Sequence, residues 1–196
     1  AAVVDLPIGE KNLHQCADAV MRLRAEFLFS TKQKENIAFI DGQNLHLGTL
    51  QDNWKVDLKR LRIYLKDKYQ IDSAYYFLSF FSKEYESLHE KLNKSGFEII
   101  FKIHPSHIKS NKKGNIDSDL IFEVMKNIVD NTKLKKIIII SSDGGYKKLV
   151  NYLIKKDKLM KILFPSQNNR SSLYHDLDRK FIDYLNNPGV RKKISK

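Results

Sequence analysis

Three stretches of the sequence carry acidic residues whose positions could support chemistry. The apolar run NIAFID ends in Asp41 and leads into Gly42-Gln43-Asn44, and the run KKIIIIS leads into Ser142 and Asp143. A basic stretch leads into Asp117-Ser118-Asp119. Carboxylates that lie close together repel one another unless they share a cation, and their hard oxygen atoms favour Mg²⁺ or Mn²⁺. Such ions orient and activate water for attack on phosphorus.

The charge balance indicates a polyanionic partner. The 196 residues include 35 Lys and Arg but only 23 Asp and Glu, which gives a formal net charge of +12. A domain this basic favours nucleic acid first and an anionic membrane surface second, although a basic surface can also serve solubility alone. A basic body around an acidic pocket is what hydrolysis of a phosphodiester requires.

Composition and length exclude several other classes. Hydrophobic residues make up 42% of the chain, enough for a core, but no apolar run approaches the roughly 20 residues of a membrane span, so we expect no membrane partner. The single cysteine, Cys16, excludes an intrachain disulfide and a CxxC-type zinc site. The first residues lack the layout of a secretory signal, so we expect a cytoplasmic protein.

Apolar runs alternate with amphipathic segments, which predicts an α/β fold. The expected strands are 36–41, 73–81, 97–103, 135–141 and 160–164, and the expected helices are 56–69, 83–94, 117–131, 146–156 and 172–185. Such alternation indicates a central, mostly parallel five-stranded sheet in a Rossmann-like three-layer α/β/α arrangement. Sites in these sheets lie at the carboxyl ends of strands, near the point where strand order reverses, where Asp41 and Asp143 would face each other.

The chain divides into three parts by composition. Residues 1–33 carry four basic and four acidic residues and resemble one amphipathic helix, which must pack on the following domain or on a second copy of the chain. A homodimer through this N-terminal helical appendage is one of these two alternatives. Residues 34–187 form the α/β domain, and residues 188–196 form a basic tail that we expect to be solvated.

Each acidic residue also has a simpler structural interpretation. Asp117 could cap the helix that follows it, and Asp143 could cap the turn before the next helix. Asp41 could bind loop amides, and Asn44 could be an Asx-turn residue. The functional interpretation depends on all of these residues reaching the same edge of one sheet.

The sequence resembles the NYN domain family, a branch of the PIN-like ribonucleases, and within it the LabA-like bacterial group. The matching stretches are IAFIDGQNL, KGNIDSDLIFEVM, IIIISSDGGYKKLV and SSLYHDLDRKFIDYL, the last similar to the family's closing helix. The resemblance implies a PIN-like fold and metal-dependent cleavage of RNA. It assigns the catalytic and metal-binding roles to Asp41, Asn44, Asp117, Asp143, Asp119 and Glu123. One position departs from the family, because Gly145 stands where many relatives carry a second acidic residue.

These observations predict a Mg²⁺- or Mn²⁺-dependent endoribonuclease that acts on single-stranded or structured RNA, with DNA open as an alternative substrate. A second hypothesis is an RNA-binding or scaffolding module without turnover, because Gly145 removes a carboxylate. An aspartyl-phosphate phosphatase is disfavoured, because no second aspartate lies two residues after Asp41. We expect the RNA backbone to be contacted by basic residues near the acidic clusters, namely Lys109, Lys112, Lys113, Lys147, Lys148 and Arg170.

Overall fold

The computed structural model describes residues 20–21, 23–24, 34–79, 86–102 and 116–196. It divides the chain into two compact units, 1–34 and 35–196. In the first unit, residues 20–21 and 23–24 are helical, and Val20, Met21 and Leu23 are exposed. The predicted dimer through this segment stays a prediction, as do the predicted domain boundaries.

The second unit is built on a sheet of six parallel strands in the order β3-β2-β1-β4-β5-β6. The strands are β1 (Glu35–Asp41), β2 (Ile71–Leu78), β3 (Glu98–Phe101), β4 (Leu134–Ile140), β5 (Leu159–Phe164) and β6 (Ile182–Tyr184). The predicted α/β fold is confirmed, with six strands rather than five. The prediction that the first and fourth strands are neighbours is also confirmed, since Phe39 pairs with Ile139. Strand order reverses between them, so a ligand site is expected at their carboxyl ends.

Two hydrophobic cores lie on opposite faces of this sheet, because successive strand residues point to opposite sides. Ile37, Phe39, Ile137 and Ile139 belong to one core, and the residues between them belong to the other: Ala38, Ile40, Ile138 and Ile140. All are almost fully buried. This double burial explains why β1 and β4 are continuous apolar runs rather than alternating ones.

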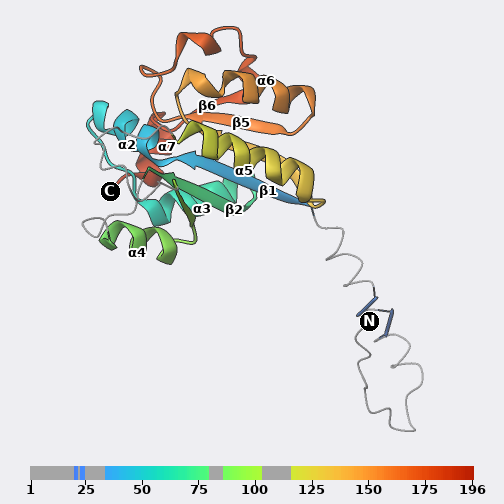
Figure 1. The fold of residues 1–196 in the computed structure, drawn as a ribbon. Helices are drawn as coiled ribbons and strands as arrows, with labels where there is room; N and C mark the ends of the chain where they lie inside the picture. Colours follow the sequence, from blue (N-terminus) through green and yellow to red (C-terminus); the bar gives the residue numbers. More distant parts are fainter. Residues whose placement is uncertain (1–19, 22, 25–33, 80–85, 103–115) are drawn as a thin grey trace, which may run out of the picture. The chain divides into compact units, whose positions relative to one another are not determined.

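Helices cover both faces and complete three layers (Figure 1). On the first face lie α5 (Asp117–Asp130) and α6 (Lys147–Lys155). The second face is covered by α2 (Gly42–Gln51), α3 (Leu58–Tyr69), α4 (Glu86–Lys94) and α7 (Pro188–Ile194). Across the described ranges, none of these helices combines the length and the apolar character needed to cross a membrane.

The predicted helix over residues 172–185 is wrong. The structure forms two short 3₁₀ turns, η3 (Ser172–Tyr174) and η4 (Arg179–Phe181), followed by β6. The Ser171 hydroxyl accepts a hydrogen bond from the Leu173 amide, and the Asp178 carboxylate accepts one from the Lys180 amide. Side chains that bind nearby amides in this way compete with a continuous helix. β6 then pairs in parallel with β5, and a helix in its place could not form these interstrand hydrogen bonds.

The lysines of residues 188–196 are exposed to solvent, as expected, but this segment is not a free tail. Pro188 starts α7, where its missing amide hydrogen costs nothing, and Ile194 is fully buried in the second core. Ser195 then forms an antiparallel bridge with Val56. The basic residues of this segment are therefore held on the body of the domain.

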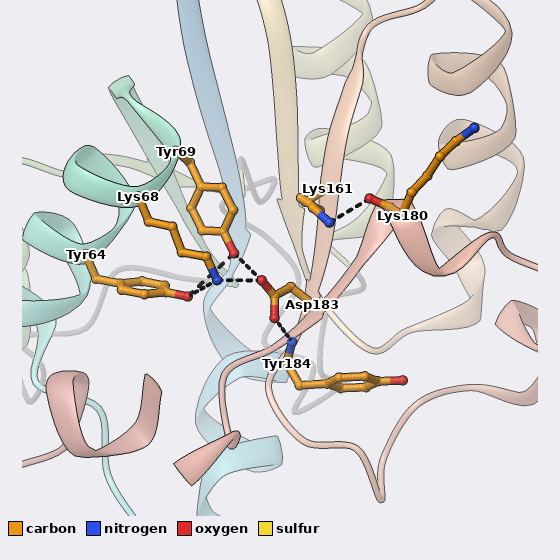
Figure 2. Close-up of polar contacts among 7 residues, drawn as sticks. All are labelled: Tyr64, Lys68, Tyr69, Lys161, Lys180, Asp183 and Tyr184. Carbon is orange, nitrogen blue, oxygen red and sulfur yellow. Dashed lines mark hydrogen bonds and ion pairs between the residues drawn. The ribbon is translucent and has the colours of Figure 1, made fainter. Parts of the chain in front are cut away.

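Asp183 fastens the edge strand β6 to the end of α3 (Figure 2). Its Oδ2 atom accepts hydrogen bonds from Lys68 Nζ at 2.6 Å and from the Tyr69 hydroxyl at 2.7 Å, while Oδ1 accepts one from the Tyr184 amide. Burial alone would raise the pKa of Asp183, but the bonds from Lys68 and Tyr69 hold it below its usual value. The ionised form of Asp183 therefore stabilises the fold.

We expect Asp183→Asn to lower the free energy of unfolding at neutral pH by about 1–2 kcal/mol, the value of a charge-assisted hydrogen bond reduced for partial exposure. Because the pKa of Asp183 is lower in the folded state, its contribution is present above about pH 4, the unfolded value, and is lost as the pH falls through the folded value. Urea unfolding at several pH values measures the difference. Asp157→Asn is the control, since its carboxylate is almost fully exposed in its pair with Lys136 and should contribute little. Equal effects of the two substitutions would contradict the assignment.

Candidate functional site

Asp41 lies at the carboxyl end of β1 and is 4% exposed. It also caps α2, because its Oδ1 atom accepts a hydrogen bond from the Asn44 amide at 2.9 Å. Gly42 allows the start of α2 to lie close to β2, since a Cβ atom at this position would lie 2.7 Å from the carbonyl oxygen of Phe77. The interpretation of Asp41 as a loop-binding residue accounts for one carboxylate oxygen. Its other oxygen, Oδ2, faces Ser141 and Tyr146.

Asp143 follows β4 at the same edge of the sheet and is exposed. Its Oδ1 atom accepts a hydrogen bond from the Gly145 amide at 2.8 Å, so Asp143 does cap the short 3₁₀ turn η2 (Gly144–Tyr146), as the simpler interpretation expects. Its own amide donates to the Ser141 hydroxyl, and its carbonyl accepts a hydrogen bond from Tyr174. These bonds hold the backbone of Asp143 from two sides.

Asp117 is the first residue of α5 and does not cap it. The N-cap is Ile116, which provides no side-chain hydrogen bond, so the capping interpretation of Asp117 is wrong. Instead, Asp117 Oδ1 accepts a hydrogen bond of 2.6 Å from the hydroxyl of Tyr146, and that hydroxyl also lies 3.3 Å from Asp41 Oδ2. A tyrosine carries one hydroxyl proton, so the two carboxylates share a single donor. Tyr146 thus joins β1, α5 and the segment after β4.

Sequence reasoning missed Tyr146. It comes three residues after Asp143, on the first turn toward α6, where an apolar residue is expected. The signal that could have found it is its hydroxyl, because a tyrosine that is fully buried needs a hydrogen-bond partner. The partners are acidic residues from separate parts of the chain, which only the fold brings together.

The electrostatics of the site follow from burial and from the crowding of negative charge. Burial raises the pKa of Asp41, and the nearby charges of Asp117 and Asp143 raise it further, although hydrogen bonds from the Asn44 amide and from Tyr146 oppose this. Burial and the same three carboxylates also raise the pKa of Tyr146. Tyr146 therefore keeps its proton.

Asn44 joins the two loops that carry Asp41 and Asp143. Its Oδ1 atom accepts a hydrogen bond of 2.7 Å from the amide of Ser142. This bond joins the loop after β1 to the loop after β4, so it sets the distance between the backbones that carry Asp41 and Asp143. The Asx-turn interpretation does not account for a bond that spans 98 residues of sequence.

Gly145 leaves a space between two of the carboxylates. A Cβ atom at this position would lie 3.1 Å from Asp117 Oδ2 and 3.4 Å from Asp143 Oδ1. A side chain at residue 145 would therefore reach the same point that both carboxylates face. Among the described residues, no three Asp, Glu, His or Cys side chains form a group that could hold a metal ion as they stand. The predicted carboxylates therefore lie near one another, but no three of them are arranged to bind a metal ion together.

The other two acidic residues of the prediction, Asp119 and Glu123, are not part of this group of carboxylates. Glu123 forms an ion pair with Lys126 and lines a groove of about 390 Å³ beside Tyr75. Asp119 lies in the first turn of α5, and its Oδ2 atom is buried with no hydrogen-bond partner among the described residues. The charges named as raising the pKa of Asp41 are those of Asp117 and Asp143.

The six basic residues that were predicted to contact RNA differ in their surroundings. Lys109, Lys112 and Lys113 lie outside the described residues. Lys147 forms an ion pair with Asp176, and Arg170 donates a hydrogen bond to the Tyr184 hydroxyl. Lys148 is exposed.

Comparison with known proteins assigns a family. Residues 36–185 match the NYN domain. The chain belongs to the NYN domain family. NYN domains have the PIN-like fold of nucleases, which agrees with the sheet order and with acidic residues at its carboxyl edge. Among solved structures, this NYN domain is similar to a protein of unknown function from Vibrio parahaemolyticus, with a TM-score of 0.67 and 16% sequence identity over 84% of this chain and 98% of that one. No curated protein matches the sequence.

We expect Asp41→Asn to stabilise the NYN domain at neutral pH in the presence of EDTA. Because the pKa of Asp41 is raised in the folded state, the wild-type protein is most stable, relative to the variant, below about pH 4, the unfolded value. That relative stability is lost as the pH rises through the folded value. Thermal unfolding from acidic to neutral pH measures the crossover. Asp130→Asn, an exposed change at the other end of α5, should show no such crossover. A neutral-pH loss of stability in Asp41→Asn would contradict this electrostatic account.

We expect Gly145→Asp to make the stability of the domain depend on divalent cations. In EDTA, a third carboxylate beside Asp117 and Asp143 should cost about 1–4 kcal/mol by Coulomb repulsion, and Mn²⁺ should reverse this cost. Gly145→Asn is the matched control, because it has the same shape without the charge. The measurement is the melting temperature with EDTA and with Mn²⁺. If both variants respond equally to Mn²⁺, no cation binds at this point.

Proposed function

We propose that this NYN domain is a Mg²⁺- or Mn²⁺-dependent endoribonuclease. The observation that carries the proposal is the shared hydroxyl of Tyr146, which holds Asp41 and Asp117 together at the sheet edge where Asp143 also lies. Like charges that a fold keeps this close in a partly buried place are costly, so their retention indicates a function that uses them. The net charge of +12 supports a polyanionic substrate.

The donor atoms suit the ion in their chemistry. Asp117 and Asp143 both face the point beside Gly145 and would hold it. Mg²⁺ in nucleotide-processing sites is commonly bound by one or two carboxylates, with water and substrate phosphate as the remaining ligands. Two facing carboxylates are therefore an adequate protein contribution. A bound Mg²⁺ or Mn²⁺ would supply Lewis acidity at a phosphoryl oxygen and a lower pKa for a bound water.

The chain's own residues would do the remaining work. Asp41, which is buried beside Asp117, would offer its Oδ2 atom as a proton acceptor near the reacting phosphate. Tyr146 would keep Asp41 and Asp117 in a fixed relation through its hydroxyl. Asn44 would hold the two strand-end loops at a constant separation.

A second candidate function is RNA binding without turnover. It is favoured by one specific observation: within the part of the chain that the structure describes, no three potential ligands are arranged to hold a metal. In this case the carboxylates would remain as a feature of the fold, and the basic surface alone would carry the activity.

The test is cleavage of end-labelled single-stranded RNA by the full chain with Mn²⁺ or with EDTA. We expect cleavage only with Mn²⁺, and a loss of at least about 100-fold in Asp143→Asn and in Asp41→Asn, the usual scale for a catalytic acid–base or charge-stabilising group. Both variants should still bind RNA, because neither substitution removes a positive charge.

Asp130→Asn is again the control, because it makes the same chemical change about 20 Å along α5 from Asp117. Its cleavage rate should equal that of the wild type. Cleavage by Asp41→Asn and Asp143→Asn at the wild-type rate would refute the site. Absence of cleavage by the wild type, together with RNA binding that EDTA leaves unchanged, would favour the binding module.

A further inference from the structure

The segment that ends in Lys196 forms a basic surface together with the start of α3. We define the α3–α7 surface by the exposed lysines that these two elements and their flanks contribute: Lys55, Lys59, Lys192, Lys193 and Lys196. Arg60 and Arg191 lie beside them and carry structural hydrogen bonds. In the described ranges, the recorded ion pairs include none of these seven residues.

Backbone contacts hold this surface in place. The Lys196 amide donates to the carbonyl of Lys55 at 3.1 Å, and the Asp57 amide donates to the carbonyl of Ile194 at 2.8 Å. Arg60 Nη1 donates to the carbonyl of Ser195 at 2.9 Å. Because the Ile194 side chain is also fully buried, the backbone segments that carry the lysines of α7 and Lys55 are held in a fixed position relative to each other. A preorganised array of charges binds a polyanion with a smaller loss of conformational entropy than a mobile tail does.

Few negative charges offset this array. Asp57 is the N-cap of α3 and its Oδ1 atom is bonded to the Arg60 amide. Asp52 is held by neighbouring polar side chains, since hydrogen bonds from Ser166 and Asn186, and more weakly the charge of Arg191, lower its pKa. Neither residue makes a recorded ion pair with a lysine of the surface.

The charges at the start of α3 are placed against the helix dipole. Lys59 and Arg60 lie in its first turn, which contains no acidic residue. Cations are unfavourable at the positive end of a helix, by about 0.3–1 kcal/mol each. The Asp57 cap offsets this cost in part, because its carboxylate already occupies the positive end of the helix. The lysine and arginine side chains, rather than the helix end, would therefore bind phosphate.

The surface lies on the same side of the molecule as the candidate site. α2 begins directly after Asp41, and Arg191 of α7 contacts Asn53 and Trp54 just beyond its end. The ten residues of α2 span about 15 Å. Figure 1 shows α2 and α7 together at the end of the sheet to which β1 points. A strand of nucleic acid a few nucleotides long could therefore reach both places.

We propose that the α3–α7 surface binds the phosphate backbone of the RNA strand that occupies the acidic site. The proposal rests on the proposed function for its choice of RNA as the polyanion. Contacts from lysines to phosphates position a strand without reading its sequence. The surface thus holds substrate independently of base identity, while the acidic site acts on it.

The experiment measures RNA binding in EDTA, so that its outcome does not depend on cleavage. End-labelled single-stranded RNA is titrated with the full chain, by fluorescence anisotropy, at several salt concentrations. The test variant combines Lys192→Gln, Lys193→Gln and Lys196→Gln, and the matched control combines Lys133→Gln, Lys135→Gln and Lys155→Gln. The control lysines are equally exposed but lie around the amino end of β4 and the end of α6, so both variants lose the same net charge.

We expect the test variant to weaken binding at least about tenfold more than the control, and to reduce the slope of log affinity against log salt by about 2, since each phosphate contact to a single strand contributes about 0.7. A second pair, Lys55→Gln with Lys59→Gln, should act in the same direction. Equal losses in test and control variants would overturn the proposal, because the attraction would then be diffuse. A loss of binding to vesicles of anionic lipid with unchanged RNA binding would overturn it too.

These outcomes are separable from those of the cleavage test. If Asp143→Asn cuts RNA normally while the α7 variant loses binding, the acidic site is wrongly assigned but the surface stands. If cleavage is abolished as expected while the α7 variant binds RNA normally, the acidic site stands and the surface is wrongly assigned.

Discussion

β1 and β4 lie side by side at the centre of a parallel sheet, and the rest of the site depends on that pairing. Both strands are buried on both faces, so a slip of one residue would exchange side chains between two cores that are packed differently. The observed register pairs Ile40 with Ile140 and places the carboxyl ends of the two strands level with each other. Asp41 and Asp143 leave the sheet at these ends, and the Asn44 bond to Ser142 closes the gap between their loops.

The same pairing brings carboxylates close enough to repel one another, and one hydroxyl group, that of Tyr146, lies between two of them. Asp117 enters from α5, so a third carboxylate approaches the other two. Tyr146 supplies one proton between Asp41 and Asp117, which reduces their repulsion but does not neutralise it. Burial first, and then the charges of Asp117 and Asp143, raise the pKa of Asp41. Carboxylates held close together in a partly buried place are typical of functional sites.

Positive charge is distributed in a way that local sequence did not indicate. Of the basic residues expected to bind RNA, Lys147 is held by Asp176 and Arg170 by Tyr184. The exposed lysines of α7 were expected to be solvated and without a defined role. The fold instead holds this segment against α3, because the buried side chain of Ile194 and the backbone bridge from Ser195 to Val56 both anchor it.

Local sequence was sufficient for the α/β class and for most strands and helices, because hydrophobic periodicity is a local signal. It also placed Asp41 and Asp143 after the apolar strands β1 and β4, where the structure has them, while their roles stay a prediction. It failed for residues 172–185, where short caps and a ladder to β5 prevail over helical spacing. It also failed for α7 and for Tyr146. The stability of α7 comes from a core built by distant segments, and the role of Tyr146 comes from two carboxylates that lie 105 and 29 residues away in sequence. Only tertiary structure brings such partners together, because hydrogen bonding and burial depend on distance in space.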